Sequence, residues 1–177
     1  YVTTSGIVTG IVTSSSGSSY AYFLQDGAAE YSGIYVYADA PAGLAQGDSV
    51  SVVGTVGEYY GLTQISAVVS DSIHSSGNAL PAAMTVTTAA ASTEPYEGVL
   101  VTATGICHVE PNNYGEWELD DGTGAVNVDD KLFSDADTSI TLGYQYSVTG
   151  PVDYSYSAFK VQPRSASDIV DTVMDPC

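Results

Sequence analysis

The sequence predicts an all-β protein made of two tandem five-stranded Greek-key barrels. Three features predict this architecture. Short β-prone runs are separated by Gly, Asp, Asn and Ser, which are the residues that favour turns. Apolar and polar residues alternate within several of these runs, and the order of the runs in the first half recurs in the second half.

The first half contains five expected strands. In one of them, Ile34 and Val36 share a face, while Tyr35 and Tyr37 share the opposite face. Only residues 41–46 and 85–91 are candidates for a helical turn. The expected strands are Gly6–Thr13, Tyr20–Gln25, Gly33–Tyr37, Ser49–Val56 and Leu62–Ser66.

An internal repeat relates the two halves. The segment Tyr22–Gly27 resembles Trp117–Gly122, and Gly47–Gly54 matches Gly143–Gly150. The last glycine of each matched pair would let a strand coil sharply enough to close a barrel. A β-sandwich with similar turns is the alternative architecture.

The repeat also predicts the domain organisation. We expect a first barrel over residues 1–69 and a second barrel with a C-terminal tail over residues 95–177. The stretch 70–94 between them is rich in Ser, Ala, Thr and Pro, which is typical of a connector.

Six segments, in this order along the chain, carry a resemblance to a known group: Phe23–Asp26, Ser32–Tyr37, Gly47–Val50, Gly61–Ile65, Tyr96–Val101 and Leu119–Gly124. The sequence resembles the OB-fold modules attached to bacterial extracellular nucleases and related large secreted proteins. In that group the modules flank a separate metal-dependent phosphodiesterase domain and carry none of its catalytic residues. The resemblance therefore implies OB-like barrels, export and a non-catalytic role.

The charge is strongly acidic, with 21 Asp and Glu against 3 Lys and Arg and a net charge of −18. Because affinity for nucleic acid depends on Lys and Arg, we expect no nucleic-acid partner. We expect no membrane insertion either, since no run approaches the roughly 18 apolar residues of a membrane span. The chain begins at Tyr1 without an initiator Met, so we expect an extracellular protein exported by a cleaved signal peptide.

The sequence shows no recognisable catalytic set, so we do not expect an enzyme. A Gly-x-Ser-x-Gly motif is absent. His74 lies in the polar connector. His108 follows Cys107 directly, and neighbouring strand residues face opposite sides, so a Cys–His nucleophile pair is not expected.

Four aspartates are candidate ligands for a weak calcium site: Asp120, Asp121, Asp129 and Asp130. Calcium prefers carboxylate oxygens, and these residues lie close together in the sequence. The alternative is turn chemistry, because Asp-Gly-Thr-Gly is typical of a hairpin turn. Apart from this possible calcium, we expect no cofactor.

The only two cysteines, Cys107 and Cys177, are expected to form a disulfide in an oxidising compartment. An internal bridge would tie the tail to the second barrel. A bond between two subunits is the alternative.

The abundant tyrosines are candidates for a surface on which copies of the protein assemble. Tyrosine combines a large apolar area with a polar tip and is enriched at interfaces, although barrel-covering tyrosines are the alternative. The candidate residues are Tyr35, Tyr37, Tyr59, Tyr60, Tyr144 and Tyr146.

These observations favour a secreted structural protein that binds copies of itself, as in an extracellular filament or surface layer. The alternative is a ligand-binding accessory module of a secreted nuclease or other hydrolase. A phosphodiesterase is the least favoured interpretation, because the acid and histidine set that it needs is not apparent.

Overall fold

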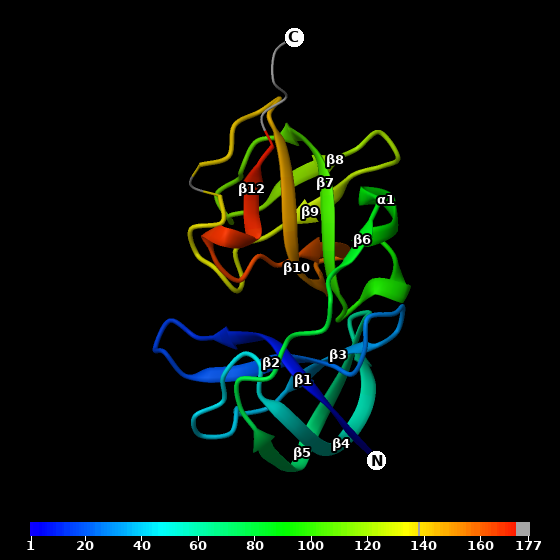
Figure 1. Ribbon diagram of the computed structural model, residues 1–177, viewed down its shortest axis with the longest axis vertical. Helices are drawn as coiled ribbons and strands as arrows, with labels where there is room; N and C mark the ends of the chain where they lie inside the picture. The colour runs from blue at the N-terminus through cyan, green and yellow to red at the C-terminus, as the bar shows by residue number, and fades with distance from the viewer. Residues whose placement is uncertain (138, 173–177) are drawn as a thin grey trace.

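The computed structural model describes residues 1–137 and 139–172 and has an all-β fold (Figure 1). One short α-helix, α1 (Thr88–Ala91), and two 3₁₀ turns accompany the strands in this part of the chain. The strands are β1 (Val2–Thr13), β2 (Ser19–Gln25), β3 (Gly33–Tyr37), β4 (Ser49–Tyr59), β5 (Leu62–Ser75), β6 (Met84–Val86), β7 (Leu100–Val109), β8 (Trp117–Asp120), β9 (Val126–Val128), β10 (Gln145–Ser155), β11 (Ala158–Val161) and β12 (Ile169–Asp171).

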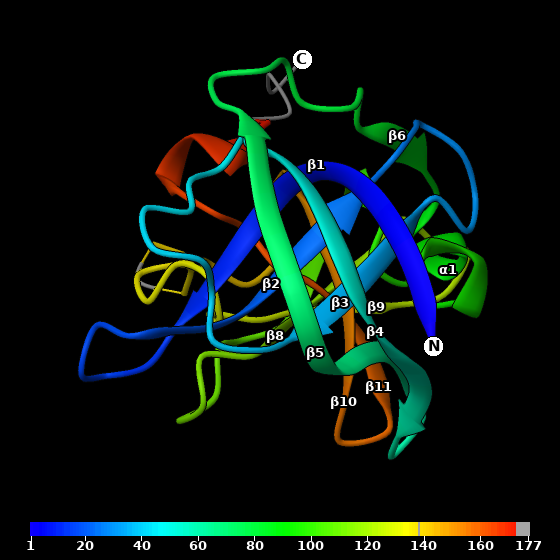
Figure 2. The same ribbon diagram turned by 90° about the horizontal axis from the view of Figure 1, so that it is seen from below.

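The first half forms a closed barrel in the strand order β1-β2-β3-β5-β4 (Figure 2). The β3–β5 pair is parallel, with Tyr35 opposite Gln64, and the other pairs are antiparallel. The interior is filled by apolar side chains that alternate along the strands, among them Val36, Val50 and Val52. A closed five-stranded barrel in the first half is therefore confirmed.

Two strands are longer than the sequence pattern predicts. β1 begins at Val2 instead of Gly6, because its first residues pair with β4. β5 continues to Ser75, inside the predicted connector, because Ser70–Ser75 pairs with Ser49–Val53 of β4. This extension is largely polar and lies on the surface, so its backbone pairing leaves little apolar alternation to detect.

The remainder of the predicted connector also contains regular structure. β6 pairs in parallel with β7, so this short strand belongs to the sheet of the second half. The predicted helical turn at 85–91 corresponds to α1, which begins after Thr87, whose side chain accepts a hydrogen bond from the Ala90 N–H.

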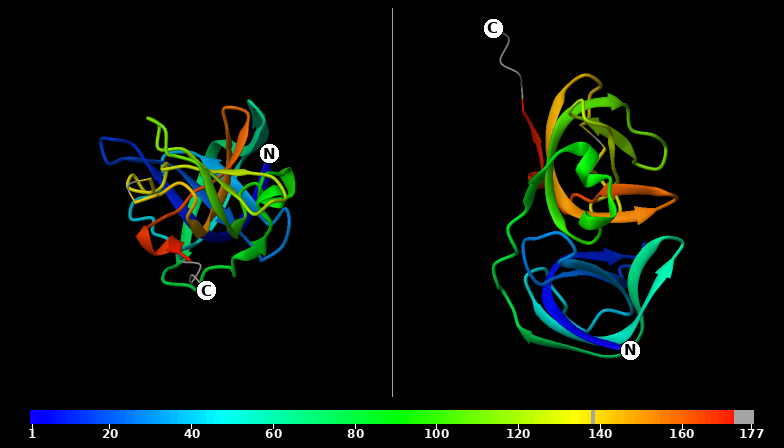
Figure 3. Two further views of the ribbon diagram at one scale, coloured as in Figure 1. Left: turned by 90° about the horizontal axis from the view of Figure 1, so that it is seen from above. Right: turned by 90° about the vertical axis from the view of Figure 1, so that its right-hand side faces the viewer.

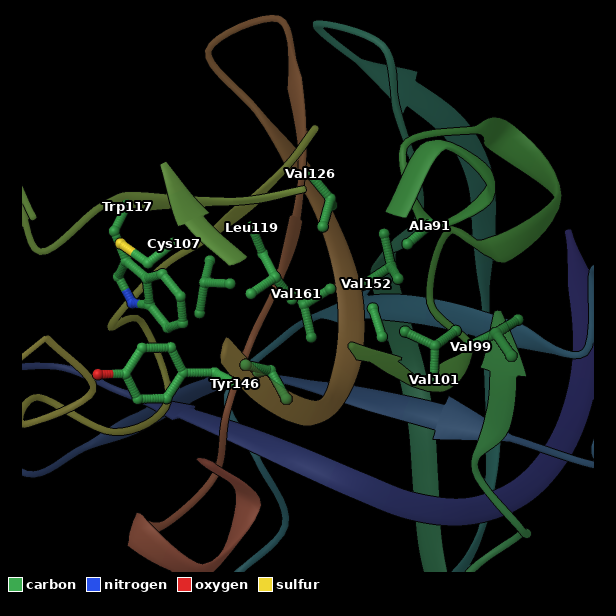
Figure 4. Close-up of a cluster of buried hydrophobic side chains, with 13 residues drawn as sticks. Ala91, Val99, Val101, Cys107, Trp117, Leu119, Val126, Tyr146, Val152 and Val161 are labelled. Atoms are coloured by element: carbon green, nitrogen blue, oxygen red, sulfur yellow. The ribbon is translucent and has the colours of Figure 1, made fainter. Parts of the chain in front are cut away.

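The second half forms a seven-stranded sheet in the order β12-β10-β11-β9-β8-β7-β6, with an additional pairing between β10 and β7. Its parallel pairs are β9–β11 and β6–β7, and the first of them corresponds to β3–β5 of the first half. In its core the Trp117 ring packs edge-on against Tyr146 at 5.6 Å between ring centroids, with Cys107 beside them (Figure 4).

The two halves dock backbone to backbone, one above the other along the long axis (Figure 3). The buried Leu100 N–H donates to the Gln25 side-chain oxygen at 2.8 Å, across 75 positions of sequence. Gly33 lies against Gly98 so closely that a Cβ on Gly33 would overlap the Gly98 carbonyl group. These contacts give the two halves a defined packing against each other.

Candidate functional site: a tyrosine cleft at the junction

A cleft of about 680 Å³ lies between the two halves, and we call it the tyrosine cleft. It is bounded by β3, by the β4–β5 hairpin of the first half and by the β10–β11 hairpin of the second half. In Figure 2 the tips of these two hairpins lie on the same side of the molecule. The residues that line it are Tyr35, Tyr37, Tyr59, Tyr60, Leu62, Gln64, Lys131, Tyr154, Ser155, Tyr156 and Ser157.

The β3 wall of the tyrosine cleft follows from strand alternation. Val36 points into the barrel, so Tyr35 and Tyr37 point out of it. Tyr35 is buried and packs edge-on against Phe23 at 5.1 Å between ring centroids. Tyr37 is 53% exposed, so it presents its ring to solvent at the cleft.

The two hairpins place tyrosines at strained turn positions. The β4–β5 loop is Tyr60-Gly61 and the β10–β11 loop is Tyr156-Ser157, and all four residues have positive φ angles between 51° and 92°. Two-residue hairpin loops of this kind favour Asn and Gly, since a tyrosine side chain is strained in the left-handed region. Tyr60 is 88% exposed and Tyr156 is 96% exposed, so burial of the ring does not offset the strain at either position.

The floor of the cleft contains a cation. Lys131 donates a hydrogen bond to Asp153, a fully buried residue of β10, and its ammonium lies 5.4 Å from the centre of the Tyr35 ring. Burial, and next the charge of Asp153, raise the pKa of the Tyr35 hydroxyl. This hydroxyl therefore stays protonated and able to donate a hydrogen bond at neutral pH.

A buried glutamate lies at the junction near the cleft. Glu97 accepts a hydrogen bond from the Thr63 N–H at 2.7 Å, so it links the second half to β5. Its other oxygen, Oε2, has no hydrogen-bond partner within residues 1–137 and 139–172. Burial raises the pKa of Glu97 to about 7, and the surrounding acidic residues, including Asp153, add to the shift.

The structure brings four of the six predicted assembly tyrosines together in the cleft: Tyr35, Tyr37, Tyr59 and Tyr60. Tyr144 is 51% exposed and is not among the cleft-lining residues. Tyr146 lies in the core of the second half, where its hydroxyl accepts a hydrogen bond from the Thr141 N–H, and it is unavailable for surface contact.

Lys131, Tyr154 and Tyr156 also line the tyrosine cleft, although they are not among the six selected candidates. The internal repeat indicates the position of Tyr156. The β10–β11 hairpin follows Gly143–Gly150 as the β4–β5 hairpin follows Gly47–Gly54, so Tyr156 is the counterpart of Tyr60. The position of Lys131 depends on how the halves dock, which no local pattern reveals.

Three of the four candidate calcium ligands, Asp120, Asp121 and Asp129, accept hydrogen bonds within the fold. Hydrogen bonds from Thr123 and from Thr88 lower the pKa of Asp121 to about 2 and hold the start of α1 against the β8–β9 turn. Asp120 accepts hydrogen bonds from the backbone N–H groups of that turn. Both residues therefore behave as turn formers.

The second aspartate pair, Asp129 and Asp130, directly follows β9. Asp129 accepts a hydrogen bond from Gln162 at 3.0 Å. Burial, together with the charges of Asp129 and Asp137, raises the pKa of Asp130. Within the described residues, no group of three or more His, Cys, Asp or Glu side chains is arranged to hold a metal ion.

The structure accounts for one of the two cysteines. Cys107 is buried, and its thiol donates a weak hydrogen bond to the Val109 carbonyl. Cys177 lies outside the described residues, so the predicted bridge stays a prediction. His108 faces away from Cys107 and contacts Glu118, and His74 contacts the Ser51 hydroxyl at 2.7 Å.

The described part of the chain contains no helix with the length and apolar composition of a membrane span. No protein-family model and no curated protein matches the sequence. One similar solved structure is that of a murine DNA-binding protein bound with double-stranded DNA. It is 10% identical, with a TM-score of 0.44, and the match covers 96% of this chain and 97% of that chain.

Proposed function

We propose that this protein is a secreted, non-catalytic subunit that binds copies of itself, and that the tyrosine cleft receives the neighbouring copy. The observation that carries the proposal is the clustering of exposed tyrosines from three separate strands and hairpins around one cleft. Tyr37, Tyr59, Tyr60 and Tyr156 are each more than half exposed there. A contiguous exposed apolar patch of this kind is typical of a protein–protein contact surface.

The strained turns support a binding role for these tyrosines. Tyr60 and Tyr156 are almost fully exposed, so they contribute little to the core. At their positive φ angles Asn or Gly would be the more stable choice. Within the chain the Tyr60 ring contacts the Tyr59 ring edge-on, and the Tyr156 ring lies 5.3 Å from the Lys160 ammonium. Most of each ring nevertheless stays exposed, which supports contact with another molecule.

The proposal includes two OB-like barrels in tandem. In the second half, the pairings β7–β8, β8–β9, β9–β11, β11–β10 and β10–β7 follow the same cycle as the barrel of the first half. Equivalent glycines support it too. A Cβ on Gly6 would lie 2.7 Å from the Gln25 carbonyl oxygen, and a Cβ on Gly105 would lie 2.7 Å from that of Asp120.

Asparagine substitutions separate assembly from folding. We expect Tyr60→Asn combined with Tyr156→Asn to relieve backbone strain, at about 1 kcal/mol per site, and to weaken self-association at least tenfold. Chemical denaturation measures the first effect, and light scattering across protein concentration measures the second.

Tyr31→Asn is the matched control for this experiment. Tyr31 also has a positive φ, 59°, and is 69% exposed, but it lies outside the tyrosine cleft. This variant should gain similar stability and keep wild-type association. Unchanged association of the double variant, or an equal loss in the control, would contradict the proposed contact surface.

A second candidate function is the binding of a neutral glycan. The cleft has the volume of a small-molecule site and combines aromatic walls with the polar groups of Gln64, Ser155 and Ser157. Titration calorimetry of the monomer with a panel of neutral oligosaccharides tests it. Saturable binding that is lost in the double tyrosine variant would favour this function, and the absence of heat would eliminate it for that panel.

A further inference from the structure

The ion pair of Lys131 and Asp153 is built unlike an ordinary surface salt bridge. The Asp153 side chain is fully buried, and its Oδ1 has no hydrogen-bond partner within residues 1–137 and 139–172. The Lys131 side chain is 23% exposed, and the Tyr35 ring covers one side of its ammonium. An ion pair in such surroundings gives up much of the hydration of both charges, so a reaction that removes both charges relieves a cost of burial.

A third titratable group, Glu97, is close enough to this pair for the charge of Asp153 to contribute to its raised pKa. Glu97 forms a backbone bridge with Val152, the neighbour of Asp153, and the adjacent Gly98 N–H donates to the Val152 carbonyl at 2.8 Å. Glu97 is buried, and its unpartnered Oε2 is free to accept or donate a proton. A pKa of about 7 suits that exchange at neutral pH.

We propose that Lys131 and Asp153 become joined by an amide bond after folding, with Glu97 transferring the proton. A proton first passes from the Lys131 Nζ to the Asp153 carboxylate within their hydrogen bond. The Nζ then attacks Cγ of the carboxyl group, so that the N–C bond forms and the C–OH bond breaks. Glu97 accepts a proton from the attacking nitrogen and delivers it to the departing hydroxyl, which leaves as water. Atoms and protons balance without an oxidant, a reductant or another reactant.

The fold supplies what this condensation needs. Two groups held in contact inside a folded protein reach effective molarities of about 10⁵ M or more, which offsets the unfavourable loss of water in dilute solution. The product amide also removes two charges from a largely dry site. This inference is independent of the proposed self-association, because all three residues belong to one chain.

The protein contains its own comparison. Lys160, the only other lysine, is also buried and contacts Glu116. There, the hydrogen bond from Lys160 lowers the pKa of Glu116, and Asn112 donates to the second carboxylate oxygen at 3.2 Å. Both oxygens of Glu116 are therefore satisfied as a carboxylate, and we expect this ion pair to persist without reacting.

Intact-mass spectrometry of the purified, denatured protein tests the proposal. We expect the wild-type mass to be lower than the sequence mass by one water, beyond any change from the cysteines. Trypsin cuts after unmodified lysine, so a linked Lys131 should leave residues 1–160 as one peptide, with Lys131 and Asp153 identified as the linked pair by fragmentation. A folded protein with its full mass and normal cleavage after Lys131 would overturn the proposal.

Variants assign the three roles. Lys131→Arg should retain its full mass, and Glu97→Gln should lose water at least tenfold more slowly. Asp153→Asn should lose ammonia in place of water, and an unchanged loss of water would overturn the assignment of Asp153. Lys160→Arg is the control and should lose water as the wild type does. Trp117 fluorescence verifies that each variant is folded, because this ring is buried in the core of the second half.

Discussion

At the scale of single residues, the unusual chemistry is concentrated where the halves meet. Glu97, Asp153 and Lys131 are charged or titratable, and all three lie where the two halves meet. Burial of such groups is costly, so they need either a paired partner or a changed protonation state. Glu97 has a changed protonation state, since burial raises its pKa to about 7.

The titration of Glu97 predicts a pH dependence of stability. Its pKa is about 7 in the folded state and 4.5 in its ordinary state, so the folded protein binds more protons between these values. The free energy of unfolding should therefore fall as the pH rises from about 4.5 to about 7, with no further loss from this group above that range. We expect Glu97→Gln to remove this contribution, as measured by denaturant unfolding at several pH values.

Glu110→Gln is the control for that measurement. Glu110 is exposed and is not among the acidic residues that raise the pKa of Glu97, so this variant should keep the wild-type slope of stability against pH. Because other groups also titrate, the informative quantity is the difference in slope between each variant and the wild type. Equal slopes for the wild type and Glu97→Gln would show that Glu97 is not the responsible group.

At the scale of strands and turns, the glycine at the start of β3 is predicted to control the docking of the halves. We expect Gly33→Ala to destabilise the protein by about 1–3 kcal/mol, because the added Cβ overlaps the Gly98 backbone and has no room to move. Gly57→Ala, in β4, places its Cβ in open space and should be neutral or stabilise by about 0.5–1 kcal/mol. Chemical denaturation measures both, and equal effects would contradict the close docking at Gly33.

The strands differ in how well their sequence pattern predicts them. β3 was predicted with its observed bounds, because apolar residues alternate with tyrosines between clear turn residues. The extension of β5 to Ser75 was not predicted, since a polar surface strand needs only backbone pairing. Tyr146 is expected on the assembly surface but lies in the core. No local sequence pattern distinguishes a tyrosine that covers a barrel from one that fills its core.

At the scale of the whole molecule, the candidate site depends on two halves that are far apart in the sequence. Tyr60 and Tyr156 belong to equivalent hairpins of the repeat, yet they line one cleft only because the halves dock as they do. The repeat was visible in the sequence, whereas the docking was not, since it rests on specific contacts such as that of Gln25 with Leu100. Lys131 and Glu97 were missed for the same reason.

The acidic surface sets the conditions under which copies can meet. With a net charge of −18, copies repel one another at low ionic strength, and added salt or cations screen that repulsion. No acidic residue is among those that line the tyrosine cleft, so the contact surface itself adds no carboxylate to this repulsion. Self-association should therefore strengthen as salt is added.

Electron cryomicroscopy of the purified protein, at low and at physiological ionic strength, shows directly whether a neighbouring copy binds in the tyrosine cleft. We expect ordered assemblies at the higher ionic strength, in which a neighbouring copy covers the tyrosine cleft and contacts Tyr60 and Tyr156. Particles that remain single copies under all conditions, or assemblies in which the cleft stays open to solvent, would contradict it.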